Sequence, residues 1–319
     1  MSKPAEASAG APIHVTMGEP AGIGPEVAVA AVRSLGGRVG GHALKLVGDP
    51  DILRALAEIP AESIVATKAR AARNPGKPDR DGAAATIEAI ELSVRAALDG
   101  AAAAIVTAPI NKAALARAGF RFPGHTEFLA HLTEAPRAVM MLASDVLRVV
   151  PLTIHIPIAE VPRAIDTASI VETGEIVLAA LRRDFAIAGP RLAVAGLNPH
   201  AGEEGAMGEE DAKIVAPAVR ELKRRGHDVR GPLSADTLFH EEARRAYDAA
   251  LCMYHDQALI PIKTLSFWDG VNVTLGLPIV RTSPDHGTAF DIAGTGKADP
   301  RSMVAAIRLA ARMADARAR

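Results

Sequence analysis

Residues 13–26 read IHVTMGEPAGIGPE, and this stretch decides the fold. The apolar run at its start is typical of a buried strand, and the loop after it is rich in glycine and proline. A helix is expected from about Pro25, because proline is favoured in the first turn of a helix. The loop lacks the order G-x-G-x-x-G, and the chain contains no G-x-x-x-x-G-K-[ST]. The sequence therefore predicts neither a Rossmann fingerprint nor the phosphate loop of an ordinary NTPase.

The same alternation of strand and helix recurs along the chain. Helices are expected at about 81–99, 111–119, 161–185, 208–226 and 299–316. Further strands are expected in the segments ALKLVGDP, AAAAIVTAP, LRVVPLTIH, RLAVAGLNP, AALCMYHD and VNVTLGLP. Apolar strands that alternate with helices predict an α/β fold with a largely parallel sheet covered on both faces.

The composition is that of a globular protein long enough for two domains, with 319 residues, 49% of them apolar and 23% charged. A net charge of -1 and 3% aromatic residues argue against a nucleic-acid or membrane partner, because phosphate backbones require a basic excess. A single cysteine, Cys252, cannot form an internal disulfide, which fits a reducing cytoplasm, and Cys252 is interpreted as a small buried hydrophobe. Residues 1–12 do not resemble a signal peptide and are expected to form a disordered tail. No apolar run predicts a membrane span.

Three of the ten histidines share a setting, because each lies at or just past the end of a predicted strand. They are His155, His200 and His255. Parallel strands bring their C-terminal ends to one edge of a sheet, so these side chains can meet there. Three neutral imidazoles that leave one position open are the ligand set of a catalytic zinc-type site. The competing interpretation is that each histidine is only hydrogen-bonded in its loop, and the pattern leaves both open.

A second group of polar residues indicates an anionic substrate. His125 and Thr126 in PGHTEF suit hydrogen bonding to a polar ligand, although Thr126 would cap the following helix equally well. Lys263, Asn272 and Arg281 are spread over an otherwise apolar stretch, and a buried lysine or arginine requires an anionic partner. A phosphate or carboxylate ligand would supply it, with arginine binding as a fork. An internal salt bridge to one of the 37 acidic residues is the alternative.

Two further features carry candidate roles. Asp236 and Lys112 are candidate catalytic bases, although an isolated aspartate is usually a turn or cap residue. The glycine-rich loop DHGTAFDIAGTGKADP (285–300) would let the diphosphate or ribose of a cofactor approach the backbone closely, and it could also be a surface connection. The loop residues expected to contact a cofactor are Asp285, His286, Gly287, Thr288, Asp291 and Gly294.

Several segments together resemble a known family. GIGPEV (22–27) and HGTAFDIAGTGKADP (286–300) resemble the isocitrate and isopropylmalate dehydrogenase-like fold, whose enzymes bind NAD or NADP without a Rossmann motif. The chain is more closely similar to 4-hydroxythreonine-4-phosphate dehydrogenases over about residues 15–305. The segments that carry this similarity include MGEPAGIGPE, APINKAAL, FPGHTEFLA, GLNPHAGEEGAMGEE, GPLSADTLF and MYHDQALIPIK.

The resemblance implies two α/β/α domains with the site in the cleft between them. Residues 1–122 and 264–319 would form the cofactor-side domain, and residues 123–263 the central domain with the metal ligands and the dimer interface. The implied reaction is NAD- or NADP-dependent oxidation of 4-phosphooxy-L-threonine to 2-amino-3-oxo-4-phosphooxybutanoate. This product would lose CO2 to give 3-amino-2-oxopropyl phosphate, in the biosynthesis of pyridoxal 5'-phosphate.

The resemblance also assigns roles to residues. A divalent metal, whether zinc, magnesium or cobalt, would be held by His155, His200 and His255, with ligands from both subunits of a homodimer. The small phosphorylated hydroxy amino acid would contact His125, Thr126, Lys263, Asn272 and Arg281. The sequence does not choose between NAD and NADP.

Other functions are compatible with the same residues. A paralogous metal-dependent dehydrogenase would act on 4-phospho-D-threonate, 4-phospho-D-erythronate or a cis-dihydrodiol. A metal-dependent phosphohydrolase would use the same histidines and cations but release phosphate without a cofactor. A non-catalytic binding protein has no reason to collect imidazoles at strand ends.

Overall fold

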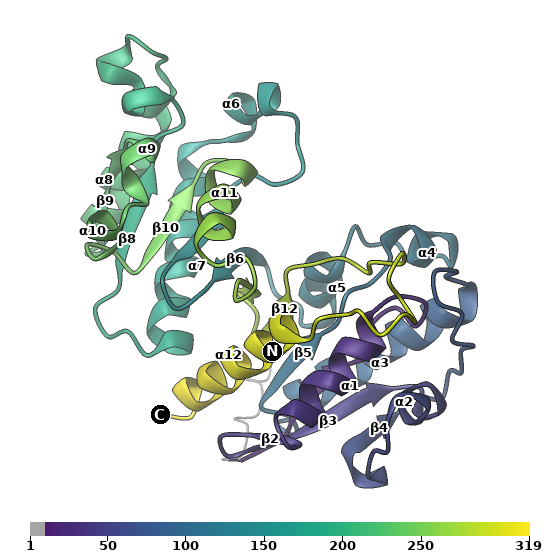
Figure 1. Cartoon of the computed structure of the whole chain (residues 1–319). Coiled ribbons are helices and arrows are strands. Elements are labelled where there is room, and N and C mark those ends of the chain that lie inside the picture. The colour runs from purple at the N-terminus through teal and green to yellow at the C-terminus, as the bar shows by residue number, and fades with distance from the viewer. Residues whose placement is uncertain (1–9) are drawn as a thin grey trace. The chain divides into compact units, whose positions relative to one another are not determined.

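The computed structural model describes residues 10–319 and divides into two compact units (Figure 1). Unit 1 comprises the chain up to Ala138 together with Val271–Arg319, and unit 2 comprises Val139–Gly270. The boundaries expected from the resemblance were 122/123 and 263/264, so the structure assigns His125 and Thr126 to unit 1. Most of the tail expected at residues 1–12 lies outside the described residues.

Unit 1 contains a mixed sheet with the strand order β2-β3-β1-β5-β12-β11. The parallel strands are β1 (Ile13–Thr16), β3 (His42–Gly48), β4 (Ile64–Ala66), β5 (Ala104–Thr107) and β12 (Arg281–Pro284). Two strands run antiparallel to their neighbours, β2 (Arg38–Val39) beside β3 and β11 (Val271–Leu275) beside β12. Parallel pairing brings the loops that follow β1 and β5 to the same edge of the sheet.

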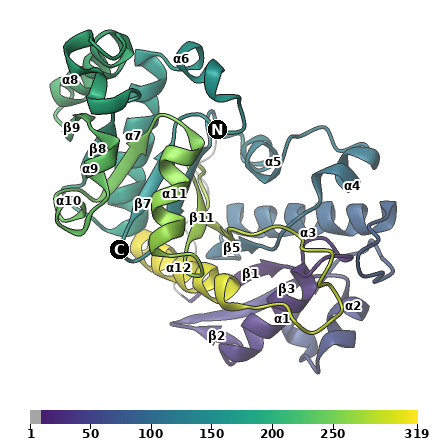
Figure 2. The same cartoon turned by 45° about the horizontal axis from the view of Figure 1, so that its top comes forward.

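Helices cover both faces of this sheet (Figure 2). α1 (Gly24–Ser34) and α12 (Arg301–Arg317) pack against each other on one face, and α3 (Arg80–Leu98) covers the other. Ile90 and Val94 of α3 are buried, as expected from the helical spacing of its apolar residues. The shorter helices of unit 1 are α2 (Pro50–Leu56), η1 (Ala61–Ser63), α4 (Lys112–Arg117) and α5 (His125–Leu132).

Unit 2 has its own sheet with the strand order β6-β7-β10-β8-β9. These strands are β6 (Val139–Ala143), β7 (Arg148–Pro151), β10 (Ala249–Cys252), β8 (Arg191–Ala195) and β9 (Asp228–Leu233). All neighbouring pairs among them are parallel except β6 with β7. The order places β10 between β7 and β8, and each of these three strands leads into the loop or helix start that carries one of the candidate histidines.

The helices of unit 2 cover its sheet and close its core. α7 (Thr167–Phe185) packs on α8 (Ala216–Arg224), and α11 (His255–Leu265) packs on β6, β7 and β10. Leu142, Val149 and Cys252 are buried beneath α11, so the interpretation of Cys252 as a buried residue is confirmed. The short helices are η2 (Ile158–Glu160), α6 (Val161–Ala164), η3 (Pro199–Gly205), η4 (Asp211–Val215), α9 (Ala235–Leu238) and α10 (Glu241–Arg244).

The expected α/β class with a largely parallel sheet is confirmed, and the differences from the expected elements are local. The helix expected at 161–185 is divided, because Asp166 caps α7 by accepting a hydrogen bond from the Ser169 amide over 2.7 Å. β12 was not expected, since RTSP lacks an apolar run. None of the described helices is both long and apolar enough to cross a membrane.

The loop after β1 requires glycine because it packs directly on the backbone of the loop 285–296. The amide of Ile23 donates to the Thr288 carbonyl oxygen over 2.9 Å. A Cβ built on Gly22 would lie 2.8 Å from that same oxygen, which is closer than real Cβ atoms approach. The glycine therefore allows the two loops to touch.

We predict that Gly22→Ala lowers the unfolding free energy by about 1–3 kcal/mol, because the new methyl group must displace a backbone oxygen. Gly41→Ala is the matched control, since no atom of the described residues lies within 4 Å of a Cβ at Gly41. Its effect should stay within about 0.5 kcal/mol. Urea unfolding of both variants measures the difference, and equal midpoints would contradict the proposed close packing.

Candidate functional site

Unit 1 contains a buried arginine that has no acidic partner. Arg281, at the start of β12, is 3% exposed. Its Nε and Nη2 donate to Thr107 Oγ1 over 3.1 and 2.6 Å, and its Nη1 donates to Thr274 Oγ1 over 2.8 Å. Among the described residues, no carboxylate forms an ion pair with it. An internal salt bridge, the alternative considered for Arg281, is therefore wrong.

The electrostatics of the surroundings confirm that this charge is uncompensated. Burial lowers the pKa of Arg281 from 12.5 to about 9, and no neighbouring charge opposes the shift. Burial also lowers the pKa of His125 well below 6.5, and the positive charges of Arg281 and Lys112 lower it further. His125 therefore stays neutral near pH 7, and a bound anion would compensate the positive charges of Arg281 and Lys112.

Two of the polar side-chain atoms of unit 1 that are buried without a hydrogen-bond partner are His125 Nε2 and Asn272 Oδ1. Asn272 lies two residues before Thr274 on β11, so both side chains face the side of the strand that Arg281 contacts. Buried polar atoms are normally satisfied, so these two indicate an absent ligand. The Lys112 ammonium lies 3.4 Å from the position of a Cβ on Gly124, the residue before His125.

The structure places the remaining substrate candidates as follows. Thr126 lies in the first turn of α5, whose N-cap is Gly124, so the interpretation of Thr126 as the helix cap is wrong. Lys263 belongs to unit 2, in the last turn of α11, with its Nζ 5.5 Å from the ring centroid of Phe267. Lys263 is thus half-buried on a helix. The apolar residues around it in the sequence had indicated a position amid buried strands, and that expectation is wrong.

Asp236 is a weak candidate for a base in this structure. Its side chain is exposed, and Ser234 Oγ donates a hydrogen bond to its Oδ1 over 2.7 Å. This hydrogen bond is the main reason that the pKa of Asp236 lies below 3.8, and the nearby His200 lowers it further. A carboxylate with a lowered pKa accepts a proton less readily. Lys112 lies beside His125 and is better placed.

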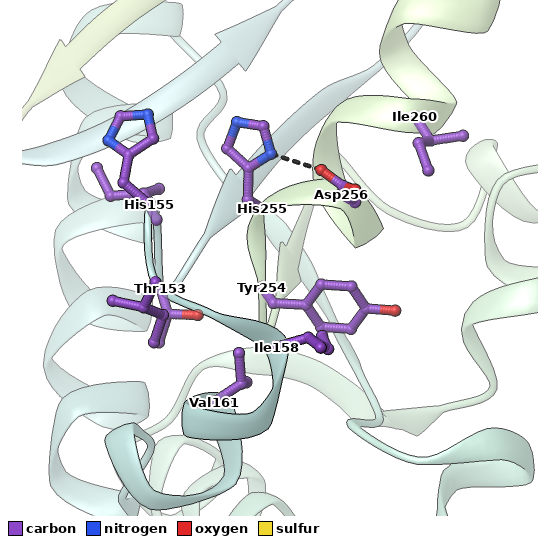
Figure 3. A pocket seen from close by; sticks show the side chains of 10 residues that line it. Thr153, His155, Ile158, Val161, Tyr254, His255, Asp256 and Ile260 are labelled. Atoms are coloured by element: carbon purple, nitrogen blue, oxygen red, sulfur yellow. Dashed lines mark hydrogen bonds and ion pairs between the residues drawn. The ribbon is translucent and has the colours of Figure 1, made fainter.

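The three candidate histidines all lie in unit 2, and the structure brings two of them together. The rings of His155 and His255 have centroids 5.7 Å apart (Figure 3). Asp256 Oδ1 is hydrogen-bonded to His255 Nδ1 over 2.7 Å, which leaves Nε2 of this ring for another partner. Within the described part of a single chain, no three His, Cys, Asp or Glu side chains gather closely enough to hold a metal. His200 is therefore not part of this pair.

The pair borders a pocket of about 590 Å³ that is lined by residues of two segments (Figure 3). One segment is 153–161, and the other begins at Tyr254 and includes the first turns of α11. Ile158 and Ile260 line the pocket and are 65% and 62% exposed. An apolar rim beside exposed imidazoles is a surface that a ligand or a second chain would cover.

His200 lies in a loop with an unusual backbone. Residues 200–204 all have positive φ, including the four non-glycine residues, with His200 at 52°. Such backbone persists only when its surroundings enforce it. The residues that enter this loop are held by Asp211, whose buried carboxylate accepts hydrogen bonds from the amides of Leu197 and Asn198 over 2.7 and 3.0 Å. The sequence did not point to Asp211, which lies in an unremarkable acidic segment.

Gln257 is a second support that the sequence did not reveal. Its Nε2 donates to the Gly196 carbonyl over 2.7 Å, and its Oε1 accepts from the Met253 amide over 2.7 Å. Gly196 follows β8 and Met253 follows β10. The buried amide therefore ties together the strand ends that precede His200 and His255.

The loop 285–296 is fixed to unit 1 at two points. The Thr288 carbonyl oxygen accepts a hydrogen bond from the Ile23 amide, and the Gly294 amide donates a hydrogen bond to Glu26 Oε1 over 2.7 Å. His286 Nε2 is buried without a hydrogen-bond partner, while a Cβ on Gly287 would meet no atom within 4 Å. A fixed loop with an unsatisfied ring nitrogen and open backbone suits a polar ligand.

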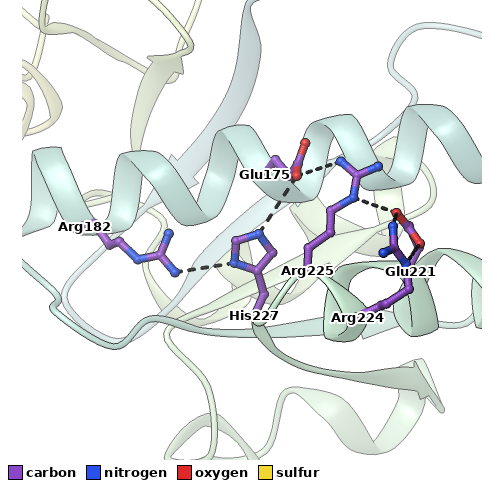
Figure 4. Close-up of polar contacts among 6 residues, drawn as sticks. All are labelled: Glu175, Arg182, Glu221, Arg224, Arg225 and His227. Carbon is purple, nitrogen blue, oxygen red and sulfur yellow. Dashed lines mark hydrogen bonds and ion pairs between the residues drawn. The ribbon is translucent and has the colours of Figure 1, made fainter.

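A second polar cluster in unit 2 is a network of paired charges (Figure 4). Glu175 of α7 contacts Arg225 over 2.8 Å, and Arg225 contacts Glu221 over 2.7 Å. Arg224 and Arg225 hold the pKa of Glu221 at about 2 through their hydrogen bonds. His227 lies between Arg182 and Glu175. The network links α7 to the end of α8 and leaves no charge that requires a ligand.

Fold and site together define an α/β protein with a buried, hydroxyl-bound arginine in one unit and a histidine pair in the other. The model of the pyridoxal phosphate biosynthetic protein PdxA family matches residues 42–310. The chain belongs to this family, which confirms the resemblance noted in the sequence.

Individual relatives agree with this assignment. The 4-hydroxythreonine-4-phosphate dehydrogenase of Paracoccus denitrificans is 55% identical over 95% of this chain and 98% of its own length. The crystal structure of the enzyme of that name from Klebsiella pneumoniae matches with a TM-score of 0.83 and 38% identity, covering 95% and 99% of the two chains. A terephthalate 1,2-cis-dihydrodiol dehydrogenase from Burkholderia xenovorans matches with a TM-score of 0.67 and 30% identity, covering 93% and 96%.

We predict that Arg281→Met leaves the unfolding free energy of the ligand-free protein unchanged or raises it, because the cost of burying an unpaired charge disappears. Arg191→Met is the control, since Arg191 Nη2 pairs with Asp248 Oδ1 over 3.1 Å. Loss of that pair should cost about 1–3 kcal/mol. Urea unfolding compares the two variants, and an equal loss of stability in both would refute the idea of an uncompensated charge.

Proposed function

We propose that this protein catalyses the dehydrogenation of 4-hydroxythreonine 4-phosphate in pyridoxal 5'-phosphate biosynthesis. The observation that carries the proposal is the buried Arg281 without an acidic partner, beside two unsatisfied buried polar atoms. A phosphorylated amino acid carries the anionic oxygens that such a site lacks. The names of the relatives at up to 55% identity support the same reaction.

In this proposal the residues of unit 1 bind and orient the substrate. Arg281 presents a fork of N–H donors to a carboxylate or phosphate. His125 Nε2 and Asn272 Oδ1 form hydrogen bonds to its polar groups, since both atoms are buried and without a partner. Thr126 follows His125 in the first turn of α5 and is the hydroxyl nearest to it in the chain. Lys263 of unit 2 is assigned to substrate binding by the resemblance alone.

The histidines of unit 2 suit a divalent metal, which would supply Lewis-acid polarisation of a substrate oxygen. The fit rests on the donor set. His155 and His255 lie side by side, and the Asp256 carboxylate orients the His255 ring through Nδ1. Imidazole is a ligand for zinc and cobalt, and magnesium prefers oxygen donors, so the histidines favour the first two metals.

The nicotinamide cofactor, NAD or NADP, would accept the hydride and is proposed to lie on the loop 285–296. The unsatisfied His286 Nε2 and the open backbone at Gly287 support this placement. The other loop residues proposed to contact it are Asp285, Thr288, Asp291 and Gly294. Lys112, in its deprotonated form, is proposed as the base in preference to Asp236, because it lies beside His125 and Asp236 is a weak acceptor.

We predict that the purified protein forms reduced nicotinamide from 4-phosphooxy-L-threonine and NAD or NADP, and that a chelator suppresses the reaction. His255→Ala should reduce turnover by more than about a hundredfold, because it removes a metal ligand and the partner of Asp256. His240→Ala replaces an exposed histidine before α10 and should leave turnover unchanged. Phosphate release without cofactor, or turnover of a cis-dihydrodiol alone, would reject the proposal in favour of the phosphohydrolase or the paralogue.

The active unit is proposed to be a homodimer in which each metal site combines histidines of two chains. His155 and His255 form a pair in one chain, and no group of three metal-binding side chains forms among the described residues of that chain. His200 would then be supplied by the second subunit. The exposed Ile158 and Ile260 at the pocket give such a partner an apolar surface to cover.

Mixing two inactive variants tests this sharing. A heterodimer of His200→Ala with His255→Ala has one site that keeps all three histidines. Its His155 and His255 come from the His200→Ala chain, and its His200 comes from the His255→Ala chain. Equal mixing and subunit exchange should therefore restore about a quarter of the wild-type activity, since half of the dimers are mixed and each has one intact site. A mixture that stays as inactive as its components would show that each site is built within one chain.

A further inference from the structure

The Arg281 guanidinium is held by hydroxyl groups alone. Arginine has five N–H donors. Three of them are used, two by Thr107 Oγ1 and one by Thr274 Oγ1, over 2.6 to 3.1 Å. The two that are left, one on each terminal nitrogen, have no acceptor among the residues that the structure describes. A pair of this kind forms the forked contact with a carboxylate or phosphate.

Both threonines lie on rigid elements. Thr107 is the last residue of β5 and is 0% exposed, and Thr274 lies in β11 and is 3% exposed. β12, which carries Arg281, pairs with both of these strands. The three side chains therefore extend from adjacent strands of one sheet, where the backbone fixes their relative positions more precisely than a loop would.

The chemistry of the two threonine hydroxyls that contact Arg281 matters as much as their geometry. A buried arginine is normally paired with a carboxylate, which satisfies its donors and also neutralises its charge. A hydroxyl oxygen accepts the same hydrogen bonds and carries no charge. The guanidinium is thus oriented while its full positive charge is kept for a ligand, at the cost of burying it.

We propose that Thr107 and Thr274 are positioning residues that orient Arg281 for the substrate anion and leave its charge uncompensated. The inference deepens the proposed function and rests on it. It assigns a role to two neutral residues that the sequence did not single out. It also explains why an aspartate at either position would be harmful, since a carboxylate there would compete with the substrate.

The test compares steady-state kinetics of valine, serine and aspartate variants. Thr107→Val and Thr274→Val should raise the KM for 4-phosphooxy-L-threonine by about tenfold to a hundredfold, the effect of losing hydrogen bonds to a charged group, with little change in kcat. Thr107→Ser keeps the hydroxyl and should restore the KM. Thr274→Asp should raise the KM more than Thr274→Val, because the new carboxylate neutralises the guanidinium.

Thr282→Val is the matched control. Thr282 is also fully buried on β12, and its hydroxyl donates to the Ala306 carbonyl over 2.9 Å, away from Arg281. Its loss should cost stability without changing the KM. An equal rise in KM for Thr282→Val and Thr107→Val would mean that any buried hydroxyl supports the fold, and would overturn the positioning role. If Thr107→Val does not fold, Thr274→Val and Thr274→Asp decide alone.

A binding measurement separates this inference from the function on which it rests. Calorimetry with inorganic phosphate, without cofactor, is applied to the wild type, Arg281→Met, Thr107→Val and Thr274→Val. Weaker binding in all three variants supports both ideas. Weaker binding in Arg281→Met alone overturns the role of the threonines and leaves the proposed function intact. Unchanged binding in all three overturns the anion site itself.

Discussion

Parallel strand pairing is the constraint on which the rest of this structure depends. In unit 2, β10 lies between β7 and β8, and all three run in the same direction. The chain therefore delivers His155, His200 and His255 to one edge of the sheet, although a hundred positions separate the first from the last. The hydrogen bonds of Gln257 then tie two of these strand ends together. The sheet brings the three loops to one edge, and the local backbone of each loop determines which imidazoles lie close together.

Strand pairing in unit 1 also brings together residues that are distant in the sequence, here threonines and an arginine. β5, β12 and β11 are neighbours, and they place two threonines around a buried arginine. The burial of an unpaired charge opposes folding, so a protein tolerates it only where function requires it. In the proposed function, Arg281, His125 and Asn272 form a substrate site whose unsatisfied polar atoms a ligand would complete. Its completion by an anion would add to the stability of the folded state as well as to catalysis.

Strain and support occur together around the histidines. His155 and His200 both have φ above 50°, a region that residues other than glycine avoid. The buried carboxylate of Asp211 holds residues 197 and 198, which lead into the left-handed turn that carries His200. Such backbone persists only when its surroundings enforce it, and it is expected at functional sites such as the proposed metal site. The apolar rim formed by Ile158 and Ile260 suits the same arrangement.

The sequence by itself determined the α/β class, because apolar strands and amphipathic helices have different periods and alternate along this chain. It also located the polar residues at strand ends, since those depend only on where an apolar run stops. The motifs over most of the chain identified the family. These features are local or cumulative, and no contact between distant residues is needed to read them.

Only the tertiary structure decided how these residues are grouped. It separated His200 from the pair of His155 and His255, assigned His125 to the same unit as Arg281, and ended the role of Thr126 as a cap. It also revealed Thr107, Thr274, Asp211 and Gln257, whose importance lies in hydrogen bonds to residues that are distant in the sequence. Such partnerships depend on strand order and on burial. Neither strand order nor burial can be read from the spacing of residue types. The same threonine at a strand end would only fill the core in one sheet order, whereas in another it accepts hydrogen bonds from a buried arginine.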